Sequence, residues 1–199
     1  MIKFLLLVAM IVYGNLAMAG QSASLVCVNP AFWNCTAFDT YQLQVTITSD
    51  ADAGLPGAFG IGAQLPNGQI ANWTSTGGWG GFITGLWQPA DGYYPALPAS
   101  KSYTVFQGTL VDMCNLTSFQ NFSLYAAHGA LQPTKEQEVQ TMIAAQASLP
   151  ANLQLPANQI RMTFIQNDAV ANQNAIKGGL VYSLDCSTIY DNDNNGGGN

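Results

Sequence analysis

The stretch from Asn72 to Tyr94 holds the side chains best suited to bind a ligand. It places three tryptophans and two tyrosines among six glycines, with amide and carboxylate groups between them. Such rings, held in turn-rich backbone, stack on the apolar faces of sugars or anchor a protein partner, while the polar groups supply directional hydrogen bonds. The predicted ligand-binding residues are Trp79, Trp87, Tyr93, Tyr94, Asn72 and Asp91.

The same aromatic residues have a second interpretation, in which the tryptophans close the ends of a β-sandwich core. Trp73 lies in strand-like sequence and is the expected core member. Trp79 stands between Gly78 and Gly80 and is expected to be the most exposed ring of the stretch. Both interpretations stay open at this point, because neighbours in sequence need not share a surface.

Catalytic motifs are missing from the sequence. His128 is the only histidine, and the chain contains neither a G-x-S-x-G nucleophile elbow nor an H-E-x-x-H zinc motif. We therefore assign no catalytic residue and expect His128 to be a structural residue that ends a strand over 119–127. A glycan-active hydrolase remains an alternative, since a glycosidase needs only two suitably separated acids. Asp91 lies in the aromatic stretch, and the other unassigned aspartates are Asp39, Asp112 and Asp185.

Two Asp-rich segments have the ligand spacing of calcium loops. Asp50 and Asp52 form the first segment, and 191–196 the second, but neither is followed by the glutamate that completes such a loop. An ordinary Asp/Gly turn and a disordered tail explain them more simply. We predict no metal and no cofactor, and keep calcium at Asp50 and Asp52 as a weak alternative.

Four cysteines follow the first 20 residues, and an even number in an exported chain suggests two disulfides with three possible connectivities. We favour Cys27 with Cys35, which would close a short loop, and Cys114 with Cys186, which would tie the last strand to the middle of the chain. Zinc is less favoured because the sequence has no Cys-x-x-Cys motif.

The N-terminal segment is typical of a secretory signal peptide. Lys3 precedes an apolar run over 4–13, and the segment closes with Ala17-Met18-Ala19, a small-residue cleavage motif. The predicted location is therefore secreted or periplasmic, with association at the cell surface. The predicted organisation is a signal peptide over 1–19, a single secreted β domain over 20–190 and a disordered Asn/Asp/Gly tail over 191–199.

The composition excludes some classes of partner. The formal net charge is −6, and only 8% of the residues are charged. Nucleic-acid binding needs a basic patch that releases counterions, and the five Lys and Arg residues are too few and too scattered to form one. No apolar stretch of transmembrane length follows Ala19. The expected partners are a surface glycan or an extracellular protein.

The apolar pattern predicts a mainly β protein. Tyr41, Leu43, Val45 and Ile47 alternate with polar residues, as in a half-buried strand. Asn67-Gly68 predicts a hairpin turn between two further strands. The remaining strands are expected over 24–28, 58–65, 70–74, 102–111, 119–126, 160–165 and 179–184.

One amphipathic helix is expected near residues 134–147. Thr134 and Gln137 fit a capping box, and the apolar stripe consists of Val139, Met142 and Ile143. A weaker helical turn is expected between 168 and 176. The predicted fold class is a mainly β, antiparallel β-sandwich, jelly-roll or Ig-like, with this one helix.

These features favour a secreted, non-catalytic binding or adhesion-type domain, which contacts a surface glycan or protein partner through its Gly/Trp-rich loops. A structural or accessory subunit of an extracellular fibre or surface layer is the first alternative, because low charge and exposed strand edges favour association. The glycan-active hydrolase that uses aspartates is the second.

Overall fold

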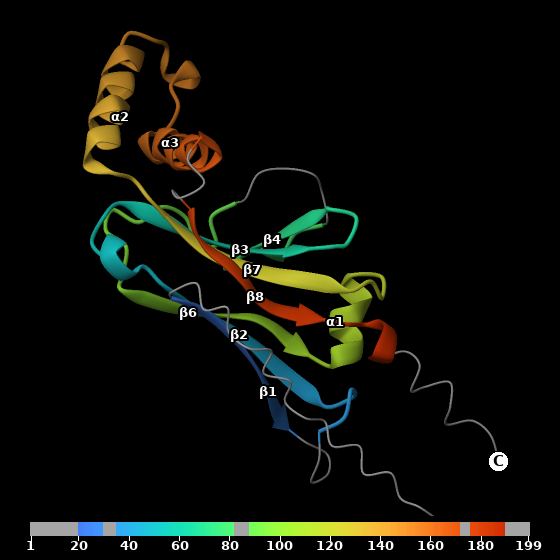
Figure 1. The fold of residues 1–199 in the computed structure, drawn as a ribbon. Helices are drawn as coiled ribbons and strands as arrows, with labels where there is room; N and C mark the ends of the chain where they lie inside the picture. The colour runs from blue at the N-terminus through green and yellow to red at the C-terminus, as the bar shows by residue number, and fades with distance from the viewer. Residues whose placement is uncertain (1–19, 30–34, 82–87, 172–175, 190–199) are drawn as a thin grey trace, which may run out of the picture.

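Two antiparallel sheets face each other in the computed structural model, which describes residues 20–29, 35–81, 88–171 and 176–189 (Figure 1). The three-stranded sheet has the order β1-β2-β6, with bounds Gln21–Asn29, Thr40–Thr48 and Ser100–Gly108. The five-stranded sheet has the order β5-β4-β3-β7-β8, with bounds Gly78–Trp79, Ile70–Thr74, Gly57–Gln64, Phe122–Ala130 and Ile176–Leu184. The predicted mainly β, antiparallel β-sandwich is confirmed. The predicted signal peptide, the predicted tail and Trp87 lie outside the described residues.

Strand β2 shows why the sheets pack face to face. Its inward side chains Tyr41, Leu43, Val45 and Ile47 are at most 8% exposed, and the residues between them are half-buried or exposed. The predicted alternation is confirmed. Burying one such side chain contributes about 1.5–3 kcal/mol, so a single strand of this kind stabilises the sandwich substantially.

Aromatic rings fill the space between the sheets. Trp73 on β4 meets Tyr103 on β6 edge to face, with ring centroids 5.5 Å apart, and Phe59 on β3 lies 6.4 Å from the same tyrosine ring. Trp73 is 8% exposed, which confirms it as a core residue.

The turn between β3 and β4 has the predicted form. Gly68 adopts a φ of +83°, and its amide donates to the carbonyl of Leu65 at 2.9 Å. The strands then pair in antiparallel register from Gly62 opposite Asn72 to Gln64 opposite Ile70. Glycine is needed at this positive φ, so the Asn-Gly signal identified the hairpin correctly.

Helix α1 (Leu110–Leu116) replaces the last residues of a predicted strand. The strand expected over 102–111 ends at Gly108, because Thr109 and Asp112 form a reciprocal capping box that starts a helix. Cys114 in this helix is joined to Cys186, and Cys27 is joined to Cys35. Both favoured disulfides are therefore confirmed.

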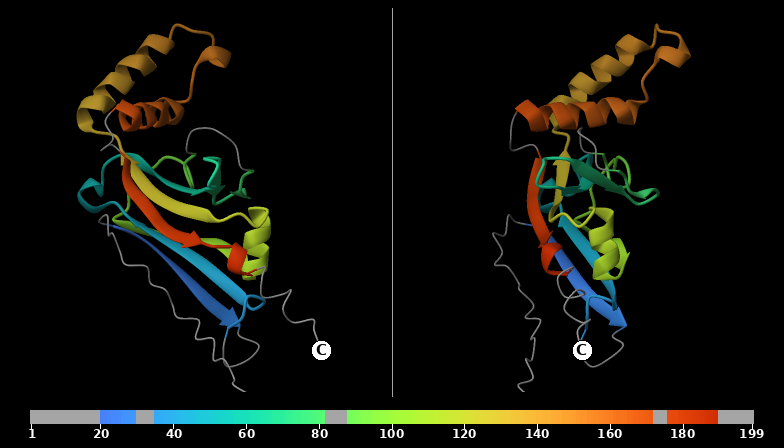
Figure 2. Two further views of the ribbon diagram at one scale, coloured as in Figure 1. Left: turned by 45° about the vertical axis from the view of Figure 1, so that its right-hand side comes forward. Right: turned by 90° about the vertical axis from the view of Figure 1, so that its right-hand side faces the viewer.

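A helical hairpin lies at the end of the sandwich opposite α1 (Figures 1 and 2). It consists of α2 (Pro133–Gln146) and α3 (Ala157–Ala171), with α3 against the sheet end and α2 outside it. A second apolar cluster holds the two helices together, made of Leu131, Val139, Ile160 and Ile165. Two short 3-10 turns complete the described elements, η1 (Asp50–Asp52) and η2 (Ala151–Leu153).

Several helix predictions need correction. The strand expected over 160–165 is wrong, because these residues belong to α3, in which Ile160 and Ile165 are buried in the second apolar cluster. The predicted single helix is one of three α-helices in the described chain. It begins at Pro133, after an N-cap residue whose side chain makes no capping bond, so the capping box at Thr134 does not form. Of the predicted apolar stripe, Val139 is buried, whereas Met142 is 48% exposed.

Among the described residues, no helix is both long and apolar enough to cross a membrane.

Candidate binding site

An open apolar cavity of about 280 Å³ lies at the α1 end of the sandwich. Both sheets and α1 contribute to its wall, together with the segment that contains β5. Small residues on β3 and β4, Ala63 and Ala71, stand where larger side chains would fill the space. The lining residues are Leu43, Ala63, Ala71, Trp79, Gly80, Gly81, Phe106, Met113, Leu116, Thr117 and Phe122.

Trp79 forms one wall of this cavity. Its Nε1 donates to the backbone carbonyl of Val105 at 2.8 Å, so the polar atom of the indole is already satisfied. The backbone of Trp79 pairs with that of Trp73 across β5 and β4. Trp79 is half-buried against the core, as are Tyr93 and Tyr94, so it does not stand fully in solvent.

The chemistry of the cavity is apolar. Its one hydroxyl, that of Thr117, lies 2.9 Å from the carbonyl oxygen of Cys114 and 2.8 Å from that of Gln120. None of the lining residues is charged. Such a wall offers no acid, base or anion-binding group, so it suits an apolar group that gains by leaving water.

Asp91 is the centre of a hydrogen-bond network that joins the loop before β6 to that strand. Its Oδ2 accepts hydrogen bonds from the hydroxyl of Tyr94 and the ammonium of Lys101, and its Oδ1 accepts one from Tyr103 at 3.0 Å. The ammonium also lies 5.0 Å from the ring centroid of Tyr94 and 5.3 Å from that of Tyr103. The hydrogen bond to Asp91 raises the pKa of Lys101, and burial raises the pKa of Tyr103. This arrangement fixes the carboxylate as a structural acceptor.

Tyr93 faces away from its neighbour in sequence. It packs against the apolar cluster of the helical hairpin, and the guanidinium of Arg161 lies 5.6 Å from its ring centroid. Burial raises the pKa of its hydroxyl. Tyr94, by contrast, packs on Phe59 in the sandwich core, with centroids 5.5 Å apart.

The predicted ligand-binding residues are therefore divided among several places. Asp91 and Tyr94 lie together, Tyr93 lies under the helices, and Trp79 lines the cavity. Asn72 is 7% exposed in β4, where it pairs with Gly62. A ligand-binding role for these residues stays a prediction, and the described ones do not share one surface.

His128 belongs to a buried polar cluster at the other end of the sheets. Its Nε2 lies 3.0 Å from Asp52 Oδ2, and its Nδ1 lies 3.4 Å from the side-chain nitrogen of Gln21. Lys177 contacts the same Asp52 oxygen at 2.7 Å. Burial alone would raise the pKa of the Asp52 carboxyl, but hydrogen bonds from Lys177 and His128 outweigh it and lower that pKa below its ordinary value. Both ring nitrogens of the 1% exposed histidine have partners, as expected for a structural residue, but His128 lies within β7 and does not end the strand as predicted.

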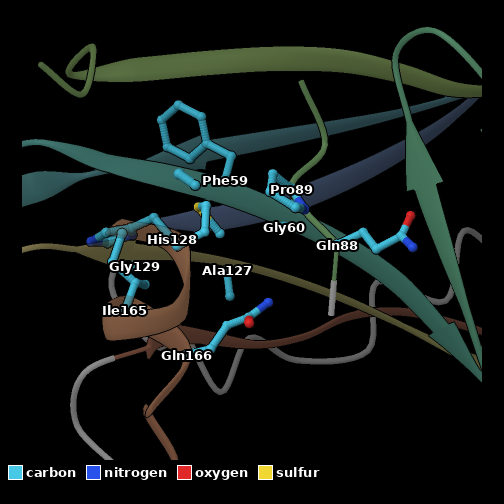
Figure 3. A pocket seen from close by; sticks show the side chains of 11 residues that line it. Phe59, Gly60, Gln88, Pro89, Ala127, His128, Gly129, Ile165 and Gln166 are labelled. Carbon is cyan, nitrogen blue, oxygen red and sulfur yellow. The ribbon is translucent and has the colours of Figure 1, made fainter. Parts of the chain in front are cut away.

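A smaller cavity beside His128 has room for water only. Its volume is about 40 Å³, and Figure 3 shows Gln88, Gln166 and His128 among the side chains around it, between β3, β7 and α3. Asp52, half of the weak calcium prediction, is turned inward to His128 and Lys177. In the part of the chain that the structure describes, no three His, Cys, Asp or Glu side chains gather as metal ligands would.

Comparison with known proteins gives no match to a family model, to a curated protein or to a solved structure. The function must therefore be inferred from the geometry of the chain itself.

Most of the cavity residues were missed by sequence reasoning. Leu43 and Phe106 were predicted as members of strands, but the strand pattern does not show that the space between them stays unfilled. The run of small residues in β3 was the available signal, because a strand rich in glycine and alanine cannot fill the space beneath it.

Proposed function

We propose that this protein is a secreted, non-catalytic binding domain that accepts an apolar group of its ligand in the cavity at the α1 end. The observation that carries the proposal is the wall of that cavity, which combines apolar side chains from both sheets with Trp79. Trp79, Gly80 and Gly81 line the cavity and come from the Gly/Trp-rich stretch, so the proposed site includes part of the sequence predicted to bind a ligand.

The size of the cavity supports a ligand group of several carbon atoms. An apolar cavity of about 150 Å³ binds benzene, and the present one is about 280 Å³. Each Å² of apolar surface removed from water contributes about 25 cal/mol. A branched alkyl chain or an aromatic ring would therefore bind more strongly than a polar group of equal size.

A glycan ligand has less support among the described residues. Sugar stacking requires a ring face open to solvent, whereas Trp73 is buried, Tyr94 packs on Phe59 and Tyr93 lies against the helices. The glycan and hydrolase alternatives stay predictions, and the experiment below includes them.

The test uses the oxidised protein without its predicted signal peptide. We would titrate it with the uncharged fluorescent probe N-phenyl-1-naphthylamine and locate the probe by NMR of the methionine methyl groups. Three methionines follow residue 19, and only Met113 lines the cavity, whereas Met142 and Met162 lie on α2 and α3. We expect saturable binding that shifts the Met113 methyl signal.

Two variants and one control sharpen the test. Leu116→Lys places a charge at the cavity wall, where the parent leucine is 52% exposed, and Ala71→Met fills the space with a flexible side chain. Each should weaken probe binding about tenfold or more, equivalent to about 1.4 kcal/mol. Leu180→Lys is the matched control, since Leu180 is 55% exposed on β8 and outside the cavity.

Three results would contradict the proposal. Probe binding that leaves the Met113 methyl signal unshifted would show that the probe binds outside the cavity. Equal probe binding by the parent, the two cavity variants and the Leu180→Lys control would show that the cavity is not the site. A fluorescence change or sugar release with a panel of polysaccharides, without any response to the probe, would favour the glycan-binding or hydrolase alternative.

A further inference from the structure

The tip of the helical hairpin exposes apolar side chains to solvent. The tip is the loop over 147–156 that joins α2 to α3 and contains η2. Leu149, Leu153 and Leu155 are 43%, 60% and 50% exposed, and Met142 in the adjoining turn of α2 is 48% exposed. No charged residue occurs between Glu138 and Arg161 in the sequence. Several large apolar side chains exposed within one uncharged segment favour an interaction site there.

The tip is held in one conformation by local bonds. The amide of Leu155 donates to Gln146 Oε1 at 2.9 Å, and the side chain of Gln154 donates to the carbonyl of Leu149 at 2.7 Å. Pro150 and Pro156 restrict the backbone further. Binding through a preorganised loop loses little conformational entropy, so the leucines are presented in a form ready to bind.

The base of the hairpin is fixed as well. Arg161 Nη2 and Nε donate to the two carboxylate oxygens of Glu136 at 2.6 and 2.9 Å, which joins α3 to α2. Val139 and Ile160 are buried in the apolar cluster of the same two helices. The tip therefore keeps its distance from the sandwich, at the end of the molecule opposite α1 (Figures 1 and 2).

Contact between the tip and the cavity would remove apolar surface from water on both sides. Both are apolar, neither contains a charged residue, and they lie at opposite ends of the same chain. A surface that fits a pocket elsewhere on an identical molecule forms a head-to-tail contact, which repeats without closing unless the rotation happens to form a ring.

We infer that the occupant of the cavity is the leucine tip of a second copy of this chain, so that copies associate head to tail. This inference rests on the proposed function, because it names the partner of the same cavity. A second copy fits better than a lipid surface, since the tip has no basic residue to attract anionic headgroups and the chain itself supplies a receptor of suitable volume. It also supports the fibre or surface-layer alternative predicted from the sequence.

The experiment measures self-association by sedimentation velocity over a wide concentration range. The tip variant carries Leu153→Ser with Leu155→Ser, and the cavity variant carries Leu116→Lys. We expect the parent mass to rise with concentration beyond that of a dimer, and both variants to stay monomeric. The control Leu180→Ser, with an equally exposed leucine on β8, should associate like the parent.

Mixing the two variants gives the sharpest test. The tip variant keeps an intact cavity and the cavity variant keeps an intact tip, so an equimolar mixture should form dimers and nothing larger. In the parent, the methyl signals of Met113 in the cavity and Met142 beside the tip should move with concentration, while that of Met162 should not.

The outcomes separate this inference from the proposed function. If the probe binds at Met113 but the parent stays monomeric at every concentration, the cavity is a binding site for another ligand and the inference is overturned. Association that needs the tip but survives Leu116→Lys would also overturn it. Tip-dependent pelleting with phosphatidylcholine and phosphatidylglycerol vesicles, without self-association, would assign the tip to a membrane surface. Absence of probe binding overturns the proposed function.

Discussion

The sandwich and the helical hairpin treat the same types of side chain differently. In the sandwich, Leu43, Ile61 and Leu124 are at most 1% exposed, and rings from both sheets interlock between them. In the hairpin, a cluster of four buried residues holds two helices, while leucines at the tip stay in solvent. The difference teaches that apolar content alone does not define a core. The sandwich buries most such residues between its sheets, although Leu180 on β8 stays exposed, whereas the hairpin gathers its exposed leucines at the tip.

The largest expected effect is the loss of stability when the Cys114–Cys186 disulfide is removed. The helical hairpin contains no cysteine, so this kind of restraint is particular to the sandwich. The Cys114–Cys186 bond spans 72 residues and the Cys27–Cys35 bond spans 8. Loop-closure entropy predicts a loss of about 4 kcal/mol for Cys114→Ala with Cys186→Ala, against about 2.5 kcal/mol for Cys27→Ala with Cys35→Ala. Urea unfolding measures both, and equal losses would show that the longer loop is already restrained in the unfolded chain.

The next effect should be confined to the hairpin. Ile160 of α3 is 1% exposed in the apolar cluster that it forms with Leu131 and Val139, so Ile160→Ala should destabilise this region by about 3 kcal/mol. Amide hydrogen exchange should accelerate in α2 and α3 and stay slow in β2, β3 and β7. Equal acceleration in the strands would show that hairpin and sandwich unfold as one unit.

The smallest effect compares one ion pair from each region as pH falls. Asp52 in the sandwich is nearly buried, whereas the Glu136 side chain in the hairpin is 28% exposed. Asp52→Asn should lower the free energy of unfolding at pH 7 by about 1.5–3 kcal/mol, and Glu136→Gln by about 1 kcal/mol or less.

The direction of the pH effect follows from the lowered pKa of each carboxyl. The hydrogen bond from Arg161 lowers the pKa of the Glu136 carboxyl. Burial alone would raise the pKa of the Asp52 carboxyl, but the hydrogen bonds from Lys177 and His128 lower it overall. Each group therefore stabilises the fold fully above its ordinary pKa, 3.8 for Asp52 and 4.5 for Glu136, and this stabilisation is lost as pH falls through the lowered value. Between about pH 6 and 2, the range in which carboxyls titrate, the free energy of unfolding should depend less steeply on pH for Asp52→Asn than for the parent. An unchanged slope would contradict the assigned pair.

Much of the sandwich could be predicted because its signals are local. Alternation identified β2, Asn67-Gly68 identified the hairpin, and the spacing of the cysteines favoured the correct disulfides. The strand prediction over 160–165 was wrong because the branched and aromatic residues of this segment have strand propensity. Packing of Ile160 and Ile165 stabilises a helix there instead. Helix formation in this segment depends on tertiary contacts that the sequence does not reveal.

The candidate site was less predictable because distant parts of the chain build it. Leu43 and Phe122 meet at the cavity from strands in different sheets, and the orientation of Trp79 depends on the carbonyl of Val105. Neighbours such as Tyr93 and Tyr94 diverge for the same reason, each following the cluster against which it packs. The aromatic stretch indicated the chemistry available, but not which rings face solvent.

The Cys114–Cys186 bond also determines how the molecule bears tension. A force that pulls on the chain after Cys186 reaches the disulfide before it reaches β8, since this cysteine follows the strand directly. The load then passes through the covalent bond into α1 and bypasses β7, the helical hairpin and β8. While the bond stays oxidised, these elements cannot be stretched out from that end. Extension under load is therefore limited to the part of the chain before Cys114, and the leucine tip keeps its shape.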